Sequence, residues 1–368
     1  ITPGMLMAAM RLNIPTIFVS GGPMEAGNFD GKGIDLIDAM VMSADSRCSD
    51  ADIEKIERWA CPGCGSCSGM FTANSMNCLN EALGLALPGN GTIVATHTNR
   101  RRLFEKAASL IVQMAGRYYF EGDDSVLPRN IATKAAFENA MSLDIAMGGS
   151  TNTVLHLLAI AYEAGVPIDL KLFNEISAKT PNLCHLAPAG PTHMPDLYAA
   201  GGIPAVQAEL AKKGLLDLDV PTVTGKTLGE NLDELKANGF YEHCDALLAE
   251  KSKKIGREIK RTDIIRSFDE PIGTNGSIAI LRGNLAPEGC VIKHTACPKA
   301  MFKATLTARP FDCEEDAIDA ILHGRIHPGD AVFIRYEGPR GSGMPEMFYT
   351  GEAICSDPTL AASVALIT

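Results

Sequence analysis

Residues 60–72 of the chain are Ala60-Cys-Pro-Gly-Cys64-Gly-Ser-Cys67-Ser-Gly-Met-Phe-Thr72, with three cysteines in seven positions. A charged helical pattern (49–60) precedes this stretch and an apolar helical pattern (72–87) follows it. The glycine-rich turn therefore brings sulfur to the start of a helix, where exposed N–H groups and the helix dipole favour a thiolate. A thiolate in such a place can bind a soft metal, carry redox chemistry or attack a carbon atom.

The other cysteines narrow this choice. The chain has 11 cysteines in 368 residues, an odd number that does not suit a small disulfide scaffold, so we expect reduced thiols inside a cell. A structural zinc site needs four ligands, and the sequence has no second C-x2-C pair. Three closely spaced cysteines also suit an iron–sulfur cluster with further ligands from elsewhere. We interpret Cys78, Cys184 and Cys244, each alone in a helical pattern, as buried and unreactive.

Charge and hydropathy exclude some partners. The net charge of −11 argues against nucleic acid and anionic membranes, which attract clustered Lys and Arg. The one basic triplet, Arg100–Arg102, opens a helical pattern, and we expect it to form a solvated face. No apolar run approaches the ~18 residues of a membrane span.

Hydrophobic patterns predict an α/β protein with two domains. We expect a helix-rich, layered α/β domain at residues 1–262 and a β-rich, barrel-like domain at residues 263–368. The chain begins at Ile1 without a Met and stops in an apolar run, so we expect both domains to be incomplete. The predicted helices are 33–44, 50–60, 72–87, 99–118, 132–147, 151–164, 195–214 and 314–324. The predicted strands are 16–20, 277–281, 289–293, 304–308, 331–335 and 364–368.

Two glycine-rich loops carry further candidates. Gly148-Gly-Ser-Thr-Asn152 offers hydroxyls, an amide and backbone N–H groups, which suit a substrate carboxylate or phosphate, or simply a helix cap. Gly338-Pro-Arg-Gly-Ser-Gly-Met-Pro-Glu346 follows a predicted strand and ends in a carboxylate. Such a carboxylate is usually only solvated, but Mg²⁺ takes ligands of this kind.

Longer stretches resemble one enzyme family. The segment Ala60–Gly91, with Cys-Pro-Gly-Cys-Gly-Ser-Cys-Ser-Gly-Met-Phe at its start, is similar to the signature of the dihydroxy-acid dehydratases. The resemblance extends through Ile1–Met7, Phe18–Gly27, Leu127–Ile131, Asp144–His156 and Ile334–Pro339, and so covers nearly the whole chain. One local difference is Lys293-His-Thr-Ala-Cys-Pro298, where the family more often has Lys-x-Ala-Gly-Val.

This resemblance implies a hydro-lyase that dehydrates 2,3-dihydroxy-3-methyl acids to 2-keto acids, a step in valine and isoleucine biosynthesis. It implies an iron–sulfur cluster, [2Fe-2S] or [4Fe-4S], as the Lewis acid for the C3 hydroxyl, and Mg²⁺ to stabilise the enolate. By the match of motifs, Cys67 is a cluster ligand and Glu346 a Mg²⁺ ligand. The resemblance places the family's other cluster ligands and a carbamylated lysine before Ile1, and the catalytic serine just after Thr368. We therefore expect residues 1–368 alone to be inactive.

Two alternatives stay open at this point. A sugar-acid dehydratase of the same family, acting on an aldonate or phosphogluconate, would need a more polar pocket. A zinc or redox protein that uses Cys61 and Cys64 belongs to a different class. For partners we expect a small dihydroxy acid, no nucleic acid, no membrane and a second copy in a homodimer. The expected location is the cytoplasm, or an organelle in a eukaryote.

Overall fold

The computed structural model describes residues 1–338 and 347–368. The chain packs into two compact units. Unit 1 comprises residues 1–26 and 63–296, and unit 2 comprises residues 27–62 and 297–368. Packing thus joins 263–296 to unit 1 and 27–62 to unit 2, whereas the sequence-based boundary at 262/263 stays a prediction. The two units are described separately below.

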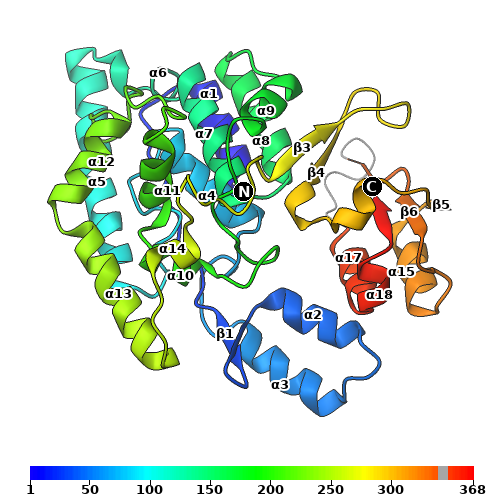
Figure 1. Cartoon of the computed structure of the whole chain (residues 1–368). Coiled ribbons are helices and arrows are strands. Elements are labelled where there is room, and N and C mark those ends of the chain that lie inside the picture. The colour runs from blue at the N-terminus through cyan, green and yellow to red at the C-terminus, as the bar shows by residue number, and fades with distance from the viewer. Residues whose placement is uncertain (339–346) are drawn as a thin grey trace. The chain divides into compact units, whose positions relative to one another are not determined.

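Unit 1 is mainly helical, and Figure 1 shows α4 and α7 in its interior, between α5 and α12 on one side and α8 and α9 on the other. Its longer helices are α1 (Thr2–Leu12), α4 (Thr72–Ala82), α5 (Thr98–Glu121), α7 (Lys134–Met147), α8 (Asn152–Ala164), α9 (Leu170–Ser177), α11 (Gly202–Ala211), α12 (Leu228–Ala237) and α13 (Phe240–Ile255). Its shorter helices are η1 (Asp124–Val126), α6 (Pro128–Ile131), α10 (Met194–Ala199), α14 (Arg261–Ile264) and η2 (His294–Ala296). Its hairpin is β3 (Ile278–Leu281) paired antiparallel with β4 (Cys290–Lys293).

Helix α7 forms the centre of the core of unit 1. Thr133 caps its start by accepting a hydrogen bond from the N–H of Ala136. Gly148 ends it in the left-handed conformation, with φ of 71°. Between these caps the helix is buried over most of its length, including Phe137 and Met141. Both ends of α7 are therefore fixed, and the Gly148–Asn152 loop begins from a rigid support.

Residues 16–20 do not form the predicted strand. Phe18 makes only an isolated bridge to Ala86, and its N–H donates to the carbonyl of Leu85 at 2.8 Å. The helix predicted at 72–87 ends at Ala82, because Gly84 takes a positive φ of 75°. A side chain at Gly84 would meet the carbonyl oxygen of Pro221 at 2.5 Å, so the chain turns there and frees residues 85–87 to pair with Phe18.

The expectation of a solvated basic face at residues 100–102 is wrong for Arg100, which is 1% exposed. Its Nη1 donates to the carbonyl of Ser20 at 3.1 Å, its Nη2 to that of Asn90 at 2.9 Å, and its Nε to that of Ile93 at 3.1 Å. Five N–H donors in a fixed fork suit three converging carbonyls. Arg100 thus joins two loop segments, one at Ser20 and one at residues 90–93, while Arg101 and Arg102 are exposed as expected.

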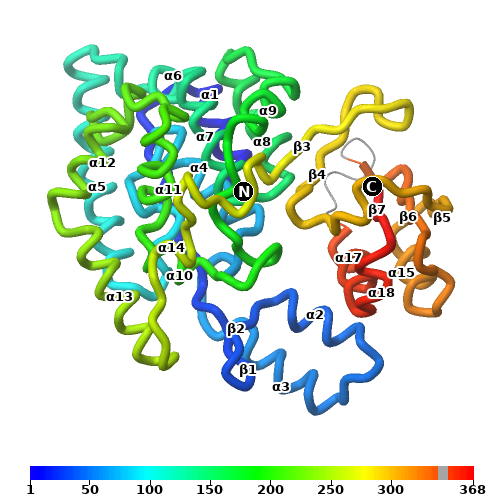
Figure 2. Tube along the Cα trace, in the orientation of Figure 1, coloured from blue at the N-terminus to red at the C-terminus, as the bar shows by residue number. Residues whose placement is uncertain are grey.

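Unit 2 consists of a hairpin followed by two helices, and of an open parallel sheet with its own helices. The hairpin pairs β1 (Gly27–Phe29) with β2 (Lys32–Ile34), and α2 (Leu36–Ala44) and α3 (Asp50–Ala60) follow it. The sheet has the order β5-β6-β7, formed by β5 (Thr307–Phe311), β6 (Asp330–Ile334) and β7 (Ala365–Ile367), which Figure 2 shows side by side. Within the described residues, the other helices of unit 2 are η3 (Lys299–Phe302), α15 (Glu314–Leu322), α17 (Phe348–Cys355) and α18 (Pro358–Ala361).

The mixed α/β class is confirmed, but the barrel-like closure is wrong for the described residues. Their sheets are small and open, with two, two and three strands. Both pairs in the three-stranded sheet are parallel, with α15 between β5 and β6 and α17 and α18 between β6 and β7. Parallel neighbours need such helical crossovers, which pack on the faces of an open sheet.

Candidate functional site

The structure divides the three cysteines between the units. Cys61 follows the last residue of α3 in unit 2, whereas Cys64 and Cys67 belong to unit 1. Cys61 and Cys64 are exposed and Cys67 is half-buried, and none of the three is in a disulfide. The expected preference for thiolate is wrong at Cys61. There, partial desolvation of the thiol and the nearby Asp35 carboxylate both raise its pKa.

The loop that carries Cys67 is fixed on one side by residues 22–24. The N–H of Ser66 donates to the carbonyl of Gly22 at 2.9 Å, and the N–H of Met24 donates to the carbonyl of Ser66 at 2.8 Å. Gly65 has a φ of 131°, and a side chain there would meet the carbonyl oxygen of Gly22 at 2.7 Å. Only glycine allows this close approach of the two backbones.

On its other side the loop is fixed by residues 187–194. The N–H of Met70 donates to the carbonyl of Ala187 at 2.7 Å, and the N–H of Met194 donates to the carbonyl of Ser68 at 2.7 Å. Segments more than 100 residues apart in the chain therefore hold the loop. This is the kind of support that keeps a functional side chain in one place.

Asn74, fully buried in the first turn of α4, makes hydrogen bonds that hold the loop against this helix. Its Nδ2 donates to the carbonyls of Cys67 and, at 2.7 Å, of Gly69. Its Oδ1 accepts a hydrogen bond from the hydroxyl of Ser66 at 2.6 Å. One carboxamide thus binds three residues of the loop, and the backbone of Cys67 is held directly.

The Gly148–Asn152 loop meets the start of α4. The hydroxyls of Thr72 and Ser150 lie 3.0 Å apart, and Nδ2 of Asn152 donates to the hydroxyl of Thr72 at 2.8 Å. The N–H of Ser150 donates to the hydroxyl of Ser75 at 3.0 Å. The two candidates from the sequence, the cysteine loop and the Gly148–Asn152 loop, therefore lie at the same helix N-terminus. We call Thr72, Ser75, Ser150 and Asn152 the hydroxyl–amide cluster.

The helix-cap interpretation of this second loop accounts for part of its structure. The N–H of Asn152 donates to the hydroxyl of Ser150 at 3.2 Å, as at a cap. Thr151, the residue at the cap position of α8, makes no side-chain cap within the described residues. The loop therefore serves to join α4 to α8 as well as to start a helix.

Asp144 and Lys293 lie behind the loop, and sequence reasoning missed both as site residues. Asp144 is fully buried, and burial raises its pKa to about 7, against the opposing effects of the Thr153 hydroxyl and Lys293. Its Oδ2 accepts from Thr153 at 2.5 Å, while its Oδ1 has no hydrogen-bond partner among the described residues. Nζ of Lys293, on β4, donates to the carbonyl of Gly148 at 2.9 Å. Burial lowers the pKa of Lys293, and the Asp144 carboxylate opposes that shift.

For Asp144, the sequence offered one signal: a carboxylate inside the apolar run that forms α7. No local pattern relates Lys293 to Gly148, since 145 residues separate them. Nothing in the structure explains why His294–Pro298 departs from the family's commoner pattern.

The described residues supply only part of a metal-binding set. Cys67 is suited to hold soft metal, because it is half-buried on a loop with a fixed backbone. Within the described ranges, no three side chains of His, Cys, Asp or Glu come close enough together to hold a metal ion. The second candidate ligand, Glu346, lies outside the described residues. The roles of Cys67 and Glu346 therefore stay predictions.

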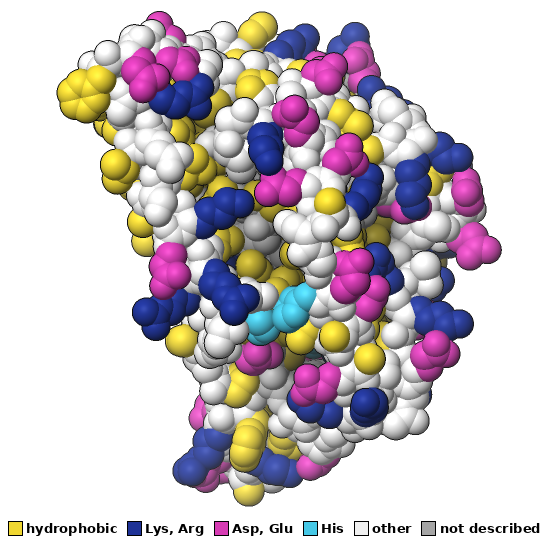
Figure 3. Space-filling view, turned by 90° about the vertical axis from the view of Figure 1, so that its left-hand side faces the viewer, with side chains coloured by type: hydrophobic (Ala, Val, Ile, Leu, Met, Phe, Trp, Pro, Cys, Tyr) yellow, Lys and Arg dark blue, Asp and Glu magenta, His cyan; other side chains and the backbone are white. Residues whose placement is uncertain are grey.

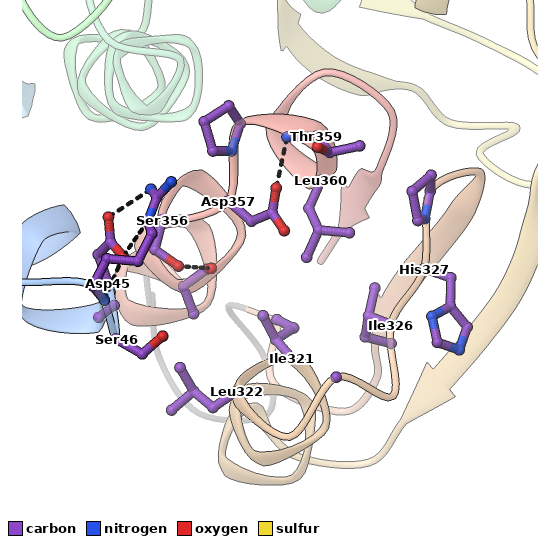
Figure 4. A pocket seen from close by; sticks show the side chains of 16 residues that line it. Asp45, Ser46, Ile321, Leu322, Ile326, His327, Ser356, Asp357, Thr359 and Leu360 are labelled. Carbon is purple, nitrogen blue, oxygen red and sulfur yellow. Dashed lines mark hydrogen bonds and ion pairs between the residues drawn. The ribbon is translucent and has the colours of Figure 1, made fainter.

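Unit 2 has a hollow of about 750 Å³, shown in Figure 4, between the end of α2, the end of α15 and the turn from α17 to α18. Three of its charged side chains are engaged locally: Arg47 pairs with Asp45 at 2.7 Å, and Asp357 accepts from the N–H of Thr359 at 2.7 Å. These three charged side chains therefore already have partners within unit 2. The candidate site remains the cysteine loop with the hydroxyl–amide cluster.

Comparison with protein families agrees with this choice. Residues 1–231 match the model of the dihydroxy-acid/6-phosphogluconate dehydratase N-terminal domain, and residues 263–368 match that of the C-terminal domain. The first match contains both the cysteine loop and the hydroxyl–amide cluster. Among the described helices, none is long and apolar enough to cross a membrane.

Proposed function

Because the chain belongs to the dihydroxy-acid/6-phosphogluconate dehydratase family, we propose that it contributes to the conversion of a 2,3-dihydroxy carboxylic acid to a 2-keto acid. The family consists of hydro-lyases, so the reaction class is the elimination of water. The observation that carries the proposal is the pair of matches at 1–231 and 263–368, which leaves only residues 232–262 outside.

The elimination sets clear chemical demands. The C2 proton and the C3 hydroxide leave together as water, and the resulting enol takes a proton at C3 to give the ketone. Hydroxide is a poor leaving group and the C2 proton is weakly acidic, so the reaction needs an electrophile and a stabilised enolate. When bound, an iron–sulfur cluster supplies the Lewis acid and Mg²⁺ supplies the positive charge for this chemistry.

Within the chain, we assign to Cys67 the task of holding the cluster. Asn74 fixes its backbone, and the contacts with residues 22–24 and 187–194 restrict the loop. A ligand held by such supports loses little entropy when it binds metal. Glu346 remains our candidate for Mg²⁺, on the basis of its motif alone.

We assign substrate binding to the hydroxyl–amide cluster. It offers hydroxyls and an amide at the N-terminus of the 11-residue helix α4, where Phe71 gives no side-chain cap within the described structure. The N–H groups and the dipole of a helix N-terminus favour a carboxylate at such a position. The cluster would orient the acid group, with the Cys67 loop next to it in sequence.

For the substrate itself we propose a 2,3-dihydroxy-3-methyl acid of branched-chain amino-acid biosynthesis. The support is the resemblance of Ala60–Gly91 to the dihydroxy-acid dehydratase signature. The alternative is a sugar acid, and the polarity of the hydroxyl–amide cluster favours it, because extra substrate hydroxyls would find partners there.

A direct assay distinguishes the two. The full-length product of the encoding gene, reconstituted with iron, sulfide and Mg²⁺, is offered 2,3-dihydroxyisovalerate, gluconate and 6-phosphogluconate at equal concentrations. The proposal expects the largest kcat/KM for 2,3-dihydroxyisovalerate. A preference for either sugar acid would select the alternative. Metal analysis addresses the zinc or redox alternative, because zinc without iron or acid-labile sulfide would support it.

We also propose a reducing compartment, the cytoplasm or an organelle. The support is that none of the 11 cysteines is in a disulfide. Three of them, Cys78, Cys184 and Cys244, are buried, and burial raises the pKa of each of these thiols. Their thiols therefore stay protonated and unreactive, as the sequence predicts for these positions.

A further inference from the structure

Helix α5 of unit 1 has one buried side and one exposed apolar side. It has 24 residues, a length of about 36 Å. Arg100, Leu103, Ala107 and Met114 face the core. On the other side Phe104 is 42% exposed, Val112 70% and Tyr119 63%. Apolar side chains of this size gathered along one helix face mark an interaction surface.

These residues follow a helical repeat. Phe104, Ala108, Val112, Ala115 and Tyr119 are separated by four, four, three and four positions, so they share one face of the helix. We call these five residues the α5 stripe. Its order of sizes is the same in both directions: aromatic, small, aliphatic, small, aromatic. If the stripe meets its own copy antiparallel across a two-fold axis, this order places residues of like size opposite each other.

The charges at the two ends of α5 favour one orientation. Arg101 and Arg102 are exposed at its start, where Arg101 also pairs with Glu105, and Glu121 and Asp124 are exposed at and just beyond its end. A parallel pair of helices would bring like charges together. An antiparallel pair brings each basic end to the partner's acidic end and opposes the two helix dipoles.

Figure 3 looks onto the side of unit 1 formed by α5, α12 and α13 and shows apolar side chains at the surface along one edge. Gly116 lies beside the α5 stripe, and no described heavy atom lies within 4 Å of a side-chain carbon built on it. A mid-helix glycine costs about 1 kcal/mol relative to alanine. The open space above it leaves room for close approach of a second helix.

We propose that the α5 stripe is the contact between two copies of this chain, paired antiparallel about a two-fold axis near Val112. The midpoint of the stripe lies between Ile111 and Val112. Phe104 then faces the partner's Tyr119, and Ala108 faces the partner's Ala115. This assigns an interface to the expected homodimer and is independent of the proposed substrate.

Two substitutions at exposed positions of α5 test this pairing. Ala108→Asp places a carboxylate in the stripe of both copies, where pairing would bury it without a partner. We expect it to raise the dimer dissociation constant at least ~100-fold, measured by sedimentation. Gln113→Asp introduces the same charge on an exposed flank of the same helix and should change the constant less than about threefold.

A second measurement does not depend on whether the fold tolerates an aspartate in α5. Val112→Cys lies beside the proposed axis, so mild oxidation should link two copies through this position. The wild-type chain and Gln113→Cys, treated identically, should give no such disulfide-linked dimer. The proposal is overturned if the wild-type chain sediments as a monomer, if Ala108→Asp leaves the dimer intact, or if Val112→Cys cross-links no more than Gln113→Cys.

Discussion

Asn74 holds Cys67 through the main chain: the carboxamide of this buried residue, seven positions after the third cysteine, donates to the carbonyl oxygen of Cys67. The same amide reaches Gly69, and its oxygen accepts from Ser66. The position of the candidate ligand is therefore set by α4, a helix whose residues after Ala73 are buried in the core of unit 1.

Asn74→Asp tests whether this support matters for metal binding. The aspartate cannot donate to the two carbonyls, so we expect the free energy of unfolding to fall by about 2–4 kcal/mol. We also expect the iron content per folded molecule to fall. Asn139→Asp is the matched control, because Asn139 makes a similar pair of hydrogen bonds with Asp217 in another part of unit 1. Iron loss in both variants, after correction for folded fraction, would contradict a positioning role for Asn74.

Cys67→Ser should abolish visible charge-transfer absorption and activity in the reconstituted full-length protein, because a serine hydroxyl is a poor ligand for iron in a cluster. Cys61→Ser and Cys64→Ser should be milder, since these exposed cysteines are not expected to be ligands. The measurements are the absorption spectrum, iron and sulfide. Equal losses in all three variants would mean that the ligand assignment is wrong or that all three sulfurs bind.

Asp144 predicts a dependence of stability on pH. Its pKa rises from 3.8 to about 7 on folding, so the folded state favours the protonated acid. That contribution is fully present below pH 3.8 and is lost as the pH rises towards 7. An asparagine at this position would keep an acceptor for Thr153 without a buried charge. Asp144→Asn should therefore flatten this part of the pH profile and, at pH 8, add on the order of 3–4 kcal/mol to the free energy of unfolding.

Denaturant unfolding of both proteins between pH 4 and pH 8 checks this. The two proteins should have similar stability at the acid end, and the variant should be the more stable one at the basic end. Parallel profiles would contradict the assignment of a raised pKa to Asp144.

Arg100→Lys should lower the free energy of unfolding by about 2–4 kcal/mol, because an ammonium cannot reproduce the three carbonyl contacts of the buried guanidinium. Arg101→Lys is the matched control within the same triplet. Its side chain is exposed and pairs with Glu105, so a change within about 0.5 kcal/mol is expected. Equal effects in the two variants, measured by urea unfolding, would show that the buried contacts of Arg100 contribute little.

Helices with clear caps could be predicted well from the sequence. The α7 helix lies between Thr133 and Gly148, and α15 begins at the predicted Glu314. The parallel order of the sheet in unit 2 could not be predicted, because short apolar runs do not reveal their neighbours. A burial pattern also cannot show that three carbonyls converge on Arg100 while Arg101 is solvated.

The candidate site, too, could be predicted only in part from the sequence. The sequence identified Cys67 and the Gly148–Asn152 loop from their residue types, and the structure brings the start of α4, just after Cys67, into contact with that loop. Asp144 and Lys293 were missed because their importance comes from burial and from a contact across 145 residues. The predicted carboxylate, Glu346, lies outside the described residues, so its relation to the loop stays a prediction.

The most direct test of the account is keto-acid release by the full-length product of the encoding gene, reconstituted with iron, sulfide and Mg²⁺, with 2,3-dihydroxyisovalerate as substrate. The account predicts formation of the 2-keto acid with loss of one water per turnover. It also predicts no formation in the Cys67→Ser variant. Absence of any keto acid from this substrate and from the two sugar acids, with the cluster intact, would contradict it.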